Sequence, residues 1–436
     1  MKPARRGGGR VISPGRTGLA VEQPALARRL GTGDAVVLGL GSMIGAGVFA
    51  AFAPAARAAG SALLVGLALA AGVGYANATA SAQLAAVYPT SGGTYVYGRE
   101  RLGPWWGFLA GWGFLIGKTA SCAAMALTFG AYVAPPGWQR PSAVAAVVAL
   151  TVVSYRGVTR TVALSRILLT VVLGALALVV TASLAGGSAS VDHLRGSAGG
   201  HGWYGVLQSA GLLFFAFAGY ARIATLGEEV RDPERTIPRA IPMALGIAVV
   251  LYAAVAVAVL LALGVPALST SKAPLAAAVS GGSWRWATPV VRLGGAAATL
   301  GSLLALLAGI GRTSLAMARH RDLPGWAGAV HPRFSVPHHA EVALAVAVCG
   351  LVLTVDLRGA IGFSSFGVLV YYLIANIAAF TQPAAQRRFP RWLQVLGGAG
   401  CAVLAATLPA AAVLGGLVMF ALGVAYRSLL VRPGTG

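Results

Sequence analysis

Long runs of apolar residues, nearly free of charge, follow one another from residue 33 to residue 430. About 18 such residues are enough to cross the roughly 30 Å hydrocarbon core of a bilayer as a helix, and about twelve runs qualify. We therefore predict an all-α integral membrane protein of about twelve transmembrane helices. The approximate spans are residues 33–57, 61–86, 104–133, 141–155, 161–185, 203–226, 238–264, 285–316, 340–355, 360–381, 392–409 and 411–430.

Glycines interrupt two of these spans. The first contains Gly-Ser-Met-Ile-Gly-Ala-Gly at residues 41–47, and the sixth contains Phe-Phe-Ala-Phe-Ala-Gly-Tyr at residues 214–220. A glycine-rich span taken alone favours close helix packing. Two interrupted spans, five apart, are instead typical of inverted-repeat transporters, whose half-helix ends hold the substrate near the midplane of the membrane. The pattern predicts that the first and sixth spans form a binding pair.

Composition and charge agree with a membrane location. Hydrophobic residues make up 57% of the 436 residues and charged residues 10%, which one water-soluble core cannot accommodate. The formal net charge of +22 does not indicate nucleic-acid binding, because its distribution follows the predicted spans: 24 of the 33 Lys and Arg residues fall on the side of the membrane where the N-terminus lies, 7 on the other side and 2 within the spans. By the positive-inside rule both termini are cytoplasmic.

The ends of the chain are predicted to be tails on either side of a transporter domain at residues 33–430. Residues 1–32 are basic, lack a secretory signal and are expected to be a disordered cytoplasmic tail, and residues 431–436 form the C-terminal cytoplasmic tail. The Arg, Ala and Gly content suggests a genome rich in G and C, hence a bacterial cell membrane. The three cysteines lie in apolar runs and are expected to be core residues.

Four separated motifs carry a resemblance to a known family. They lie at residues 41–49, 88–95, 227–238 and 312–324. In these motifs the chain resembles the amino acid-polyamine-organocation permeases. The resemblance implies a leucine-transporter-like fold with helices 1 and 6 discontinuous: inverted five-helix repeats at about 33–185 and 203–381, and two additional helices at about 392–430.

The resemblance also implies secondary active transport of an amino acid or a related small amine by alternating access. A neutral amino acid is favoured, because Lys118 and Arg222 without a nearby acid would repel a dication. An exchanger or exporter of cationic or acidic amino acids or polyamines, and a nutrient sensor without flux, remain alternatives. No catalytic cluster, cofactor site or metal site is expected, and the oligomeric state is open.

Backbone groups at the two interruptions are the expected substrate contacts. The first is expected to bind a carboxylate through free N–H groups, and carbonyls of the second to bind the ammonium group. An aromatic gate is implied at Phe215 by the resemblance. The predicted contacts are Ser42, Met43, Ile44, Gly45, Ala46, Gly47, Lys118, Phe215, Ala216, Phe217, Ala218, Gly219 and Tyr220.

Lys118 lies near the middle of the third span, where a charge is costly and usually faces a cavity or a partner. Three roles are open: it binds an anionic group, it loses its proton during part of the cycle, or it takes the place of a bound cation. Relatives commonly carry a lysine in the fifth span instead, and this chain has none there. A lysine without a transport role is the plainer interpretation.

Gating and coupling are assigned to Phe215 and to charged residues in the third span and near the sixth span. Lys118 and Arg222 are candidates, and Glu228 and Glu229 are expected either to form ion pairs near Arg99 or Arg319 or to face solvent.

The coupling ion is open between H⁺ and Na⁺. A possible cation site combines backbone of the first interruption with hydroxyls of the eighth span. Its residues are Gly41, Ile44, Thr299 and Ser302.

Overall fold

The protein is described by a computed structural model. It covers residues 30–89, 92–157, 162–194, 202–225, 229–334 and 336–430. Within these ranges the chain is helical without strands, and one isolated bridge pairs Leu30 with Val230. The predicted tails at residues 1–32 and 431–436 lie almost entirely outside the described residues.

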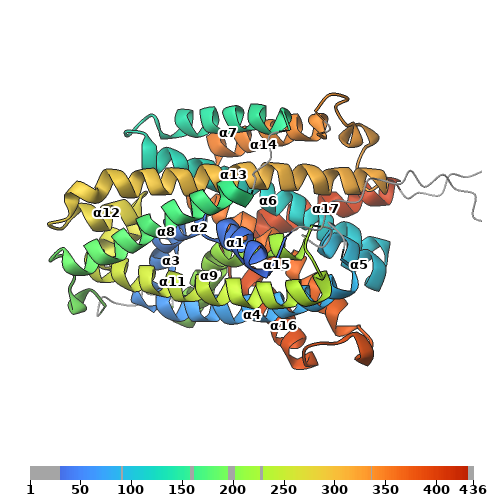
Figure 1. Cartoon of the computed structure of the whole chain (residues 1–436), viewed down its shortest axis with the longest axis horizontal. Coiled ribbons are helices and arrows are strands. Elements are labelled where there is room, and N and C mark those ends of the chain that lie inside the picture. Colours follow the sequence, from blue (N-terminus) through green and yellow to red (C-terminus); the bar gives the residue numbers. More distant parts are fainter. Residues whose placement is uncertain are drawn as a thin grey trace, which may run out of the picture.

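The helices run for the most part along one direction of an elongated bundle (Figure 1). They are α1 (Thr32–Met43), α2 (Ala46–Ala50), α3 (Phe52–Ala59), α4 (Leu63–Val87), α5 (Thr94–Leu102), α6 (Pro104–Val133), α7 (Gln139–Tyr155), α8 (Val162–Ala185), α9 (Gly202–Phe217), α10 (Ala221–Ala224), α11 (Pro233–Thr270), α12 (Pro274–Ser280), α13 (Thr288–Arg319), α14 (His338–Thr354), α15 (Leu357–Phe380), α16 (Arg391–Ala406) and α17 (Ala410–Leu430).

Nine helical stretches among the described residues are long and apolar enough to cross a membrane. Three other predicted spans form α7, α14 and α16, which have 17, 17 and 16 residues. At about 1.5 Å per residue such helices reach only about 25 Å. The integral membrane class predicted from the sequence is therefore supported by nine clear spans, and the count of twelve stays a prediction.

The first predicted interruption is present as a break, and at the second the helical stretch changes to a 3₁₀ turn without a break. Between α1 and α2, Ile44 (φ −80°, ψ 61°) and Gly45 (φ −116°, ψ −138°) leave the helical conformation. Between α9 and α10 the chain passes through a 3₁₀ turn at Ala218–Tyr220. The first predicted span, residues 33–57, is thus divided among α1, α2 and α3.

The two interruptions pack directly on one another through glycine. A Cβ atom on Gly47 would lie 2.5 Å from Cα of Ala216, and one on Gly219 would lie 2.6 Å from the backbone nitrogen of Met43. Only glycine allows two backbones to approach this closely. The packing role that a single glycine-rich span would suggest therefore applies here, in addition to any contact with a ligand.

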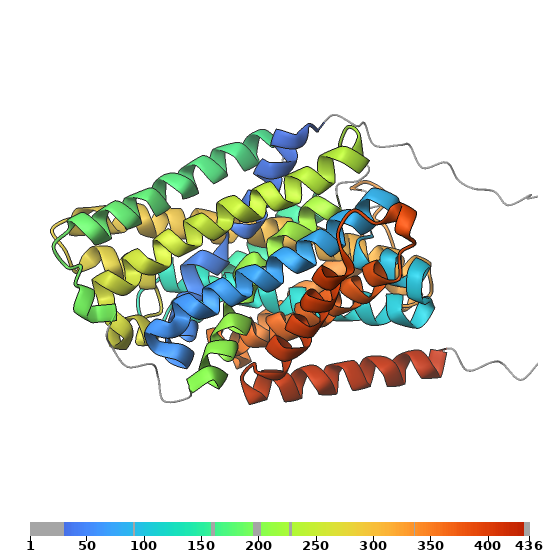
Figure 2. The same ribbon diagram turned by 90° about the horizontal axis from the view of Figure 1, so that it is seen from below.

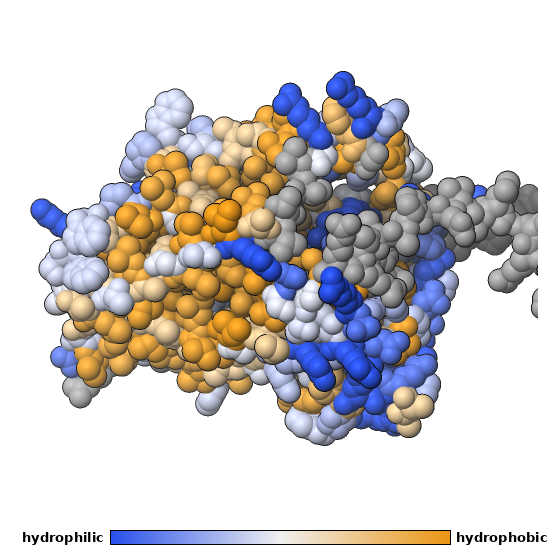
Figure 3. Space-filling model, viewed as in Figure 1, coloured by the Kyte–Doolittle hydropathy of each residue, from blue (hydrophilic) through white to orange (hydrophobic). Residues whose placement is uncertain are grey.

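The surface divides into an apolar belt and a hydrophilic end. Figure 3 shows apolar residues over the middle of the bundle, and hydrophilic ones gathered at the end where α5 lies. Val250, Leu293 and Val346 are each more than two-thirds exposed, as expected for side chains that face lipid. The start of α1 and the end of α17 lie at this same hydrophilic end (Figure 2).

Candidate functional site

A cavity of about 110 Å³ lies where the interrupted helices meet α6 and α13. We call it the central cavity. An engineered cavity of about 150 Å³ accepts benzene, so this volume suits a small solute. Eleven sequence-predicted residues line it: Ser42, Met43, Gly45, Ala46, Gly47, Lys118, Phe215, Ala218, Gly219, Arg222 and Ser302.

Four predicted contacts pack behind this wall within the described structure. Ile44 faces a separate small cavity, and Ala216 packs on Gly47. The ring of Phe217 contacts Tyr252, and that of Tyr220 stacks on Tyr372. Successive residues of a helix point in directions about 100° apart, so an unbroken run of residues cannot all face one cavity.

Lys118 is the most deeply buried of the cations that line the central cavity. Its side chain is 7% exposed, and its Nζ donates to the carbonyl of Ala218 at 3.4 Å. The hydroxyl of Tyr372 donates to the same carbonyl at 3.4 Å. A substrate ammonium group that binds this carbonyl, as predicted for the second interruption, would therefore share it with Lys118 and Tyr372.

Tyr252 of α11 connects the two interruptions from behind. Its hydroxyl lies 2.6 Å from the carbonyl oxygen of Met43 and 3.0 Å from that of Ala216. Its single proton serves one of them at a time. Sequence reasoning missed this residue, and the available signal was a lone hydroxyl in the otherwise apolar seventh span.

We expect Tyr252→Phe to lower the thermal unfolding midpoint of the detergent-solubilised protein. The change removes the hydroxyl that, among the residues placed in the structure, alone bridges the two breaks, at a cost of about 1 kcal/mol. Tyr75→Phe, on the exposed face of α4, is the matched control. Equal midpoints for the two variants would show that the bridge does not hold the breaks together.

Two arginines also line the central cavity. Arg312 of α13 is exposed there and Arg222 is half-buried. The charged groups that act on Arg222 are Arg312, of the same sign, and Glu229. Arg312 was not among the sequence-predicted site residues, because its place at the end of a span resembled that of an ordinary cytoplasmic arginine.

The segment with Glu229 is tied to the start of the first helix. The amide of Leu30 donates to the carbonyl of Glu229 at 3.1 Å, and the amide of Arg231 donates back to the carbonyl of Leu30 at 2.8 Å. Glu228 lies outside the described residues. Two backbone hydrogen bonds thus join Leu30, which precedes α1, to the segment that precedes α11.

The residues of the possible cation site do not share one cavity. Gly41 and Ile44 line a pocket of about 10 Å³, whereas Ser302 lines the central cavity. Thr299 Oγ1 donates within its own helix, to the carbonyls of Gly295 and Ala296 at 2.8 and 2.9 Å. Ser302 Oγ is buried without a hydrogen-bond partner among the described residues.

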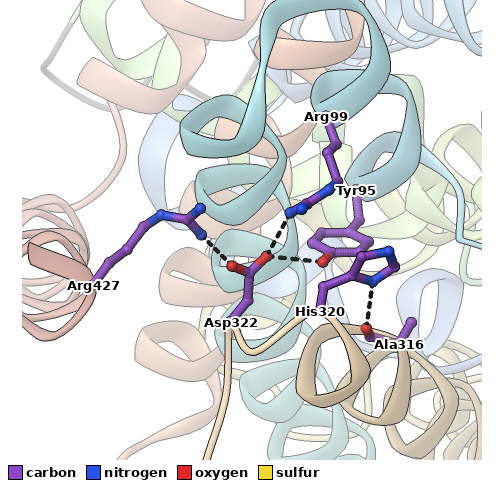
Figure 4. A network of polar contacts seen from close by, with 6 residues as sticks. All are labelled: Tyr95, Arg99, Ala316, His320, Asp322 and Arg427. Carbon is purple, nitrogen blue, oxygen red and sulfur yellow. Dashed lines mark hydrogen bonds and ion pairs between the residues drawn. The ribbon is translucent and has the colours of Figure 1, made fainter. Parts of the chain in front are cut away.

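A buried polar cluster at the hydrophilic end was also missed. The side chain of Asp322 accepts from Tyr95 at 2.8 Å and pairs with Arg427 at 2.5 Å and with Arg99 at 3.4 Å (Figure 4). The guanidinium of Arg427 also lies over the ring of Phe108, 4.8 Å from its centre. Among the described residues, then, the carboxylate beside Arg99 is Asp322.

The same cluster keeps the hydroxyl of Tyr95 protonated. Burial, followed by the hydrogen bond to Asp322, raises the pKa of Tyr95 well above its ordinary value. Tyr95 comes from α5, Asp322 from the connection after α13, and Arg427 from α17. The cluster thus joins three elements that are distant in sequence.

Comparison with known proteins agrees with this architecture. A profile described as "Amino acid permease" matches residues 30–426. An uncharacterized transporter of Mycobacterium tuberculosis (strain ATCC 25618 / H37Rv) is 59% identical over 410 residues, 93% of each chain.

More distant relatives carry more specific names. The cationic amino acid transporter 7, chloroplastic, of Arabidopsis thaliana is 29% identical over 83% of this chain and 66% of its own. The branched-chain amino acid permease BcaP of Bacillus subtilis (strain 168) is 24% identical over 85% and 84%. The names point to a transporter and not to an enzyme. With the family profile covering nearly the whole chain, this membrane protein belongs to the amino acid permease family.

Proposed function

We propose that the protein is a secondary active transporter that moves an amino acid across the cell membrane by alternating access. The observation that supports this proposal is that residues of both interruptions, of α6 and of α13 line one cavity of a size that suits a small solute. This is the arrangement expected of a carrier with its site at the junction of two broken helices. A membrane enzyme would need a catalytic cluster, which the lining of this cavity does not supply among the described residues.

The backbone at the first interruption supplies the carboxylate contact in this proposal. Gly45, Ala46 and Gly47 line the central cavity at the start of α2. The first N–H groups of a helix have no partner within it, and the helix dipole favours an anion there. Phe215, which is buried at the cavity wall, is the gate in this proposal.

We propose two inverted five-helix repeats followed by two additional helices, with the Arg-rich end of the bundle in the cytoplasm. The positive-inside rule supports this orientation, and the start of α1 and the end of α17 lie at that end of the bundle (Figure 2). The exposed Arg312 lies near the end of α13, toward the same side. The conformation described here is then one in which the central cavity opens inward.

The experiment is a binding screen followed by flux. Purified protein is tested for thermal stabilisation by the twenty amino acids and common amines, and each stabilising compound is then assayed for uptake into proteoliposomes under pH and sodium gradients. We expect at least one amino acid to stabilise the protein and to accumulate with one of the gradients. Stabilisation without uptake under any gradient would favour the nutrient sensor and contradict the proposal.

A further inference from the structure

We infer that the transported substrate is an acidic amino acid, whose side-chain carboxylate is attracted by cationic side chains along the substrate path. The inference rests on the proposed function and names the substrate class of the same site. Three observations support it: the charge of the central cavity, the unused hydrogen-bonding capacity of Lys118, and the charge of the cavities near α12.

The central cavity is lined by cations without acids. Lys118, Arg222 and Arg312 contribute to its wall, and no Asp or Glu does so among the described lining residues. Glu229 acts on Arg222 from outside the lining. Counted over the residues that the structure describes, one acid against three cations leaves the cavity positive.

The most deeply placed of these cations has an unused capacity for binding an anion. Within the described part of the chain, Lys118 Nζ makes one hydrogen bond, a long one of 3.4 Å to the neutral carbonyl of Ala218. An ammonium group can donate three hydrogen bonds. A buried ammonium without a counter-ion is costly, and a substrate carboxylate would relieve that cost.

A second positive region lies near α12, which is at the end of the bundle opposite to α5 (Figure 1). Two adjoining cavities of about 310 and 560 Å³ share Gln139, Ser271 and Lys272 among their lining residues. We call them together the vestibule. Its charged lining residues are Arg57, Arg140, Lys272, Arg292, Asp356 and Arg358.

The single acid of the vestibule is already engaged. Asp356 Oδ1 accepts from the amide of Gly359 at 2.9 Å and so caps the start of α15. Asp356 keeps its charge and acts on Arg358, so the described lining residues of the vestibule amount to five cations against one carboxylate. A cleft lined by one sign of charge concentrates solutes of the opposite sign and raises their rate of association.

The central cavity and the vestibule thus favour solutes of the same sign of charge. A zwitterion with a neutral side chain gains little from net positive charge, a cationic amino acid is repelled, and a second carboxylate finds arginine and lysine donors. The sequence alone favoured a neutral amino acid. Arg312 and the vestibule, which became apparent only in the folded chain, shift the preference to an acidic one.

The test compares pairs of nearly equal shape. Dissociation constants are measured for purified wild-type protein with L-glutamate and L-glutamine, with L-aspartate and L-asparagine, and with L-arginine. We expect the better acid to bind at least tenfold more tightly than its amide and than arginine. An amide or arginine that binds as tightly as the acids, or failure of both acids to bind, overturns the inference.

Variants locate the selectivity. Arg312→Gln and Lys118→Gln are each expected to reduce the preference for the acid over its amide at least tenfold, whereas Arg319→Gln, exposed on the same helix as Arg312 but outside the cavity lining, retains it. An unchanged preference in both cavity variants contradicts the assignment. Flux is measured separately from binding. Transport of glutamine but not of glutamate would contradict the acidic substrate class and leave the proposal of a transporter intact. Binding of glutamate without flux would contradict the proposal of a transporter and leave the acidic ligand class intact.

Discussion

Gly219→Ala is expected to reduce uptake to background while the protein still reaches the membrane. The added Cβ would lie 2.5 Å from the carbonyl carbon of Ser42 and 2.6 Å from the nitrogen of Met43. These are backbone atoms of the first interruption, so no side chain can rotate to make room. Overpacking of this kind costs about 1–3 kcal/mol or more and separates the two breaks that form the site. The measurement is amino acid uptake per molecule of membrane-inserted protein.

Gly309→Ala is the matched control for this prediction. Gly309 also lines the central cavity, but a Cβ there would have no heavy atom within 4 Å. Most of the uptake should remain in this variant. Normal uptake by Gly219→Ala, or an equal loss in both variants, would mean that contact between the two breaks does not form the site.

Asp322→Asn is expected to destabilise the protein by about 3 kcal/mol, since removal of one partner leaves a buried charge uncompensated. Asp322 and Arg427 are only 5% and 6% exposed at their side chains, and Arg427 is the cation left behind. The loss appears as a lower thermal unfolding midpoint in detergent. Arg427→Met should cost less, because Asp322 then keeps Arg99 and Tyr95.

Glu100→Gln is the control for the cluster. Glu100 is an exposed acid of α5, the helix that carries Tyr95 and Arg99. Its replacement should change stability by no more than about 0.5 kcal/mol. If Asp322→Asn unfolds at the same temperature as Glu100→Gln, the cluster does not hold α5, α13 and α17 together.

The sequence predicted the spans well wherever local signals mark their ends. The third span was expected at residues 104–133 and forms α6 with the same bounds, because Gly103 adopts φ 104° and Pro104 occupies the first turn. The interruption at Gly45 was also predictable, since glycine density is a local property. The inverted repeats themselves remain a proposal, as does the orientation in the membrane.

Contacts between distant segments could not be read from the chain. Tyr252 lies 209 positions from Met43, to which it donates, and Arg427 lies 105 positions from Asp322. Each is an ordinary residue of its own span or loop, and only packing gives it a partner. The same limit explains why a continuous run from Phe215 to Tyr220 was predicted as contacts when only part of it faces the cavity.

The central claim is that the protein carries an amino acid through the central cavity. The most direct measurement is counterflow in proteoliposomes, in which each labelled amino acid in turn is presented to vesicles preloaded with the same compound. Wild-type protein should accumulate at least one of them transiently above equilibrium, and Gly309→Trp, which fills the cavity, should not. Absence of counterflow for all twenty amino acids, or full counterflow by Gly309→Trp, would contradict the account.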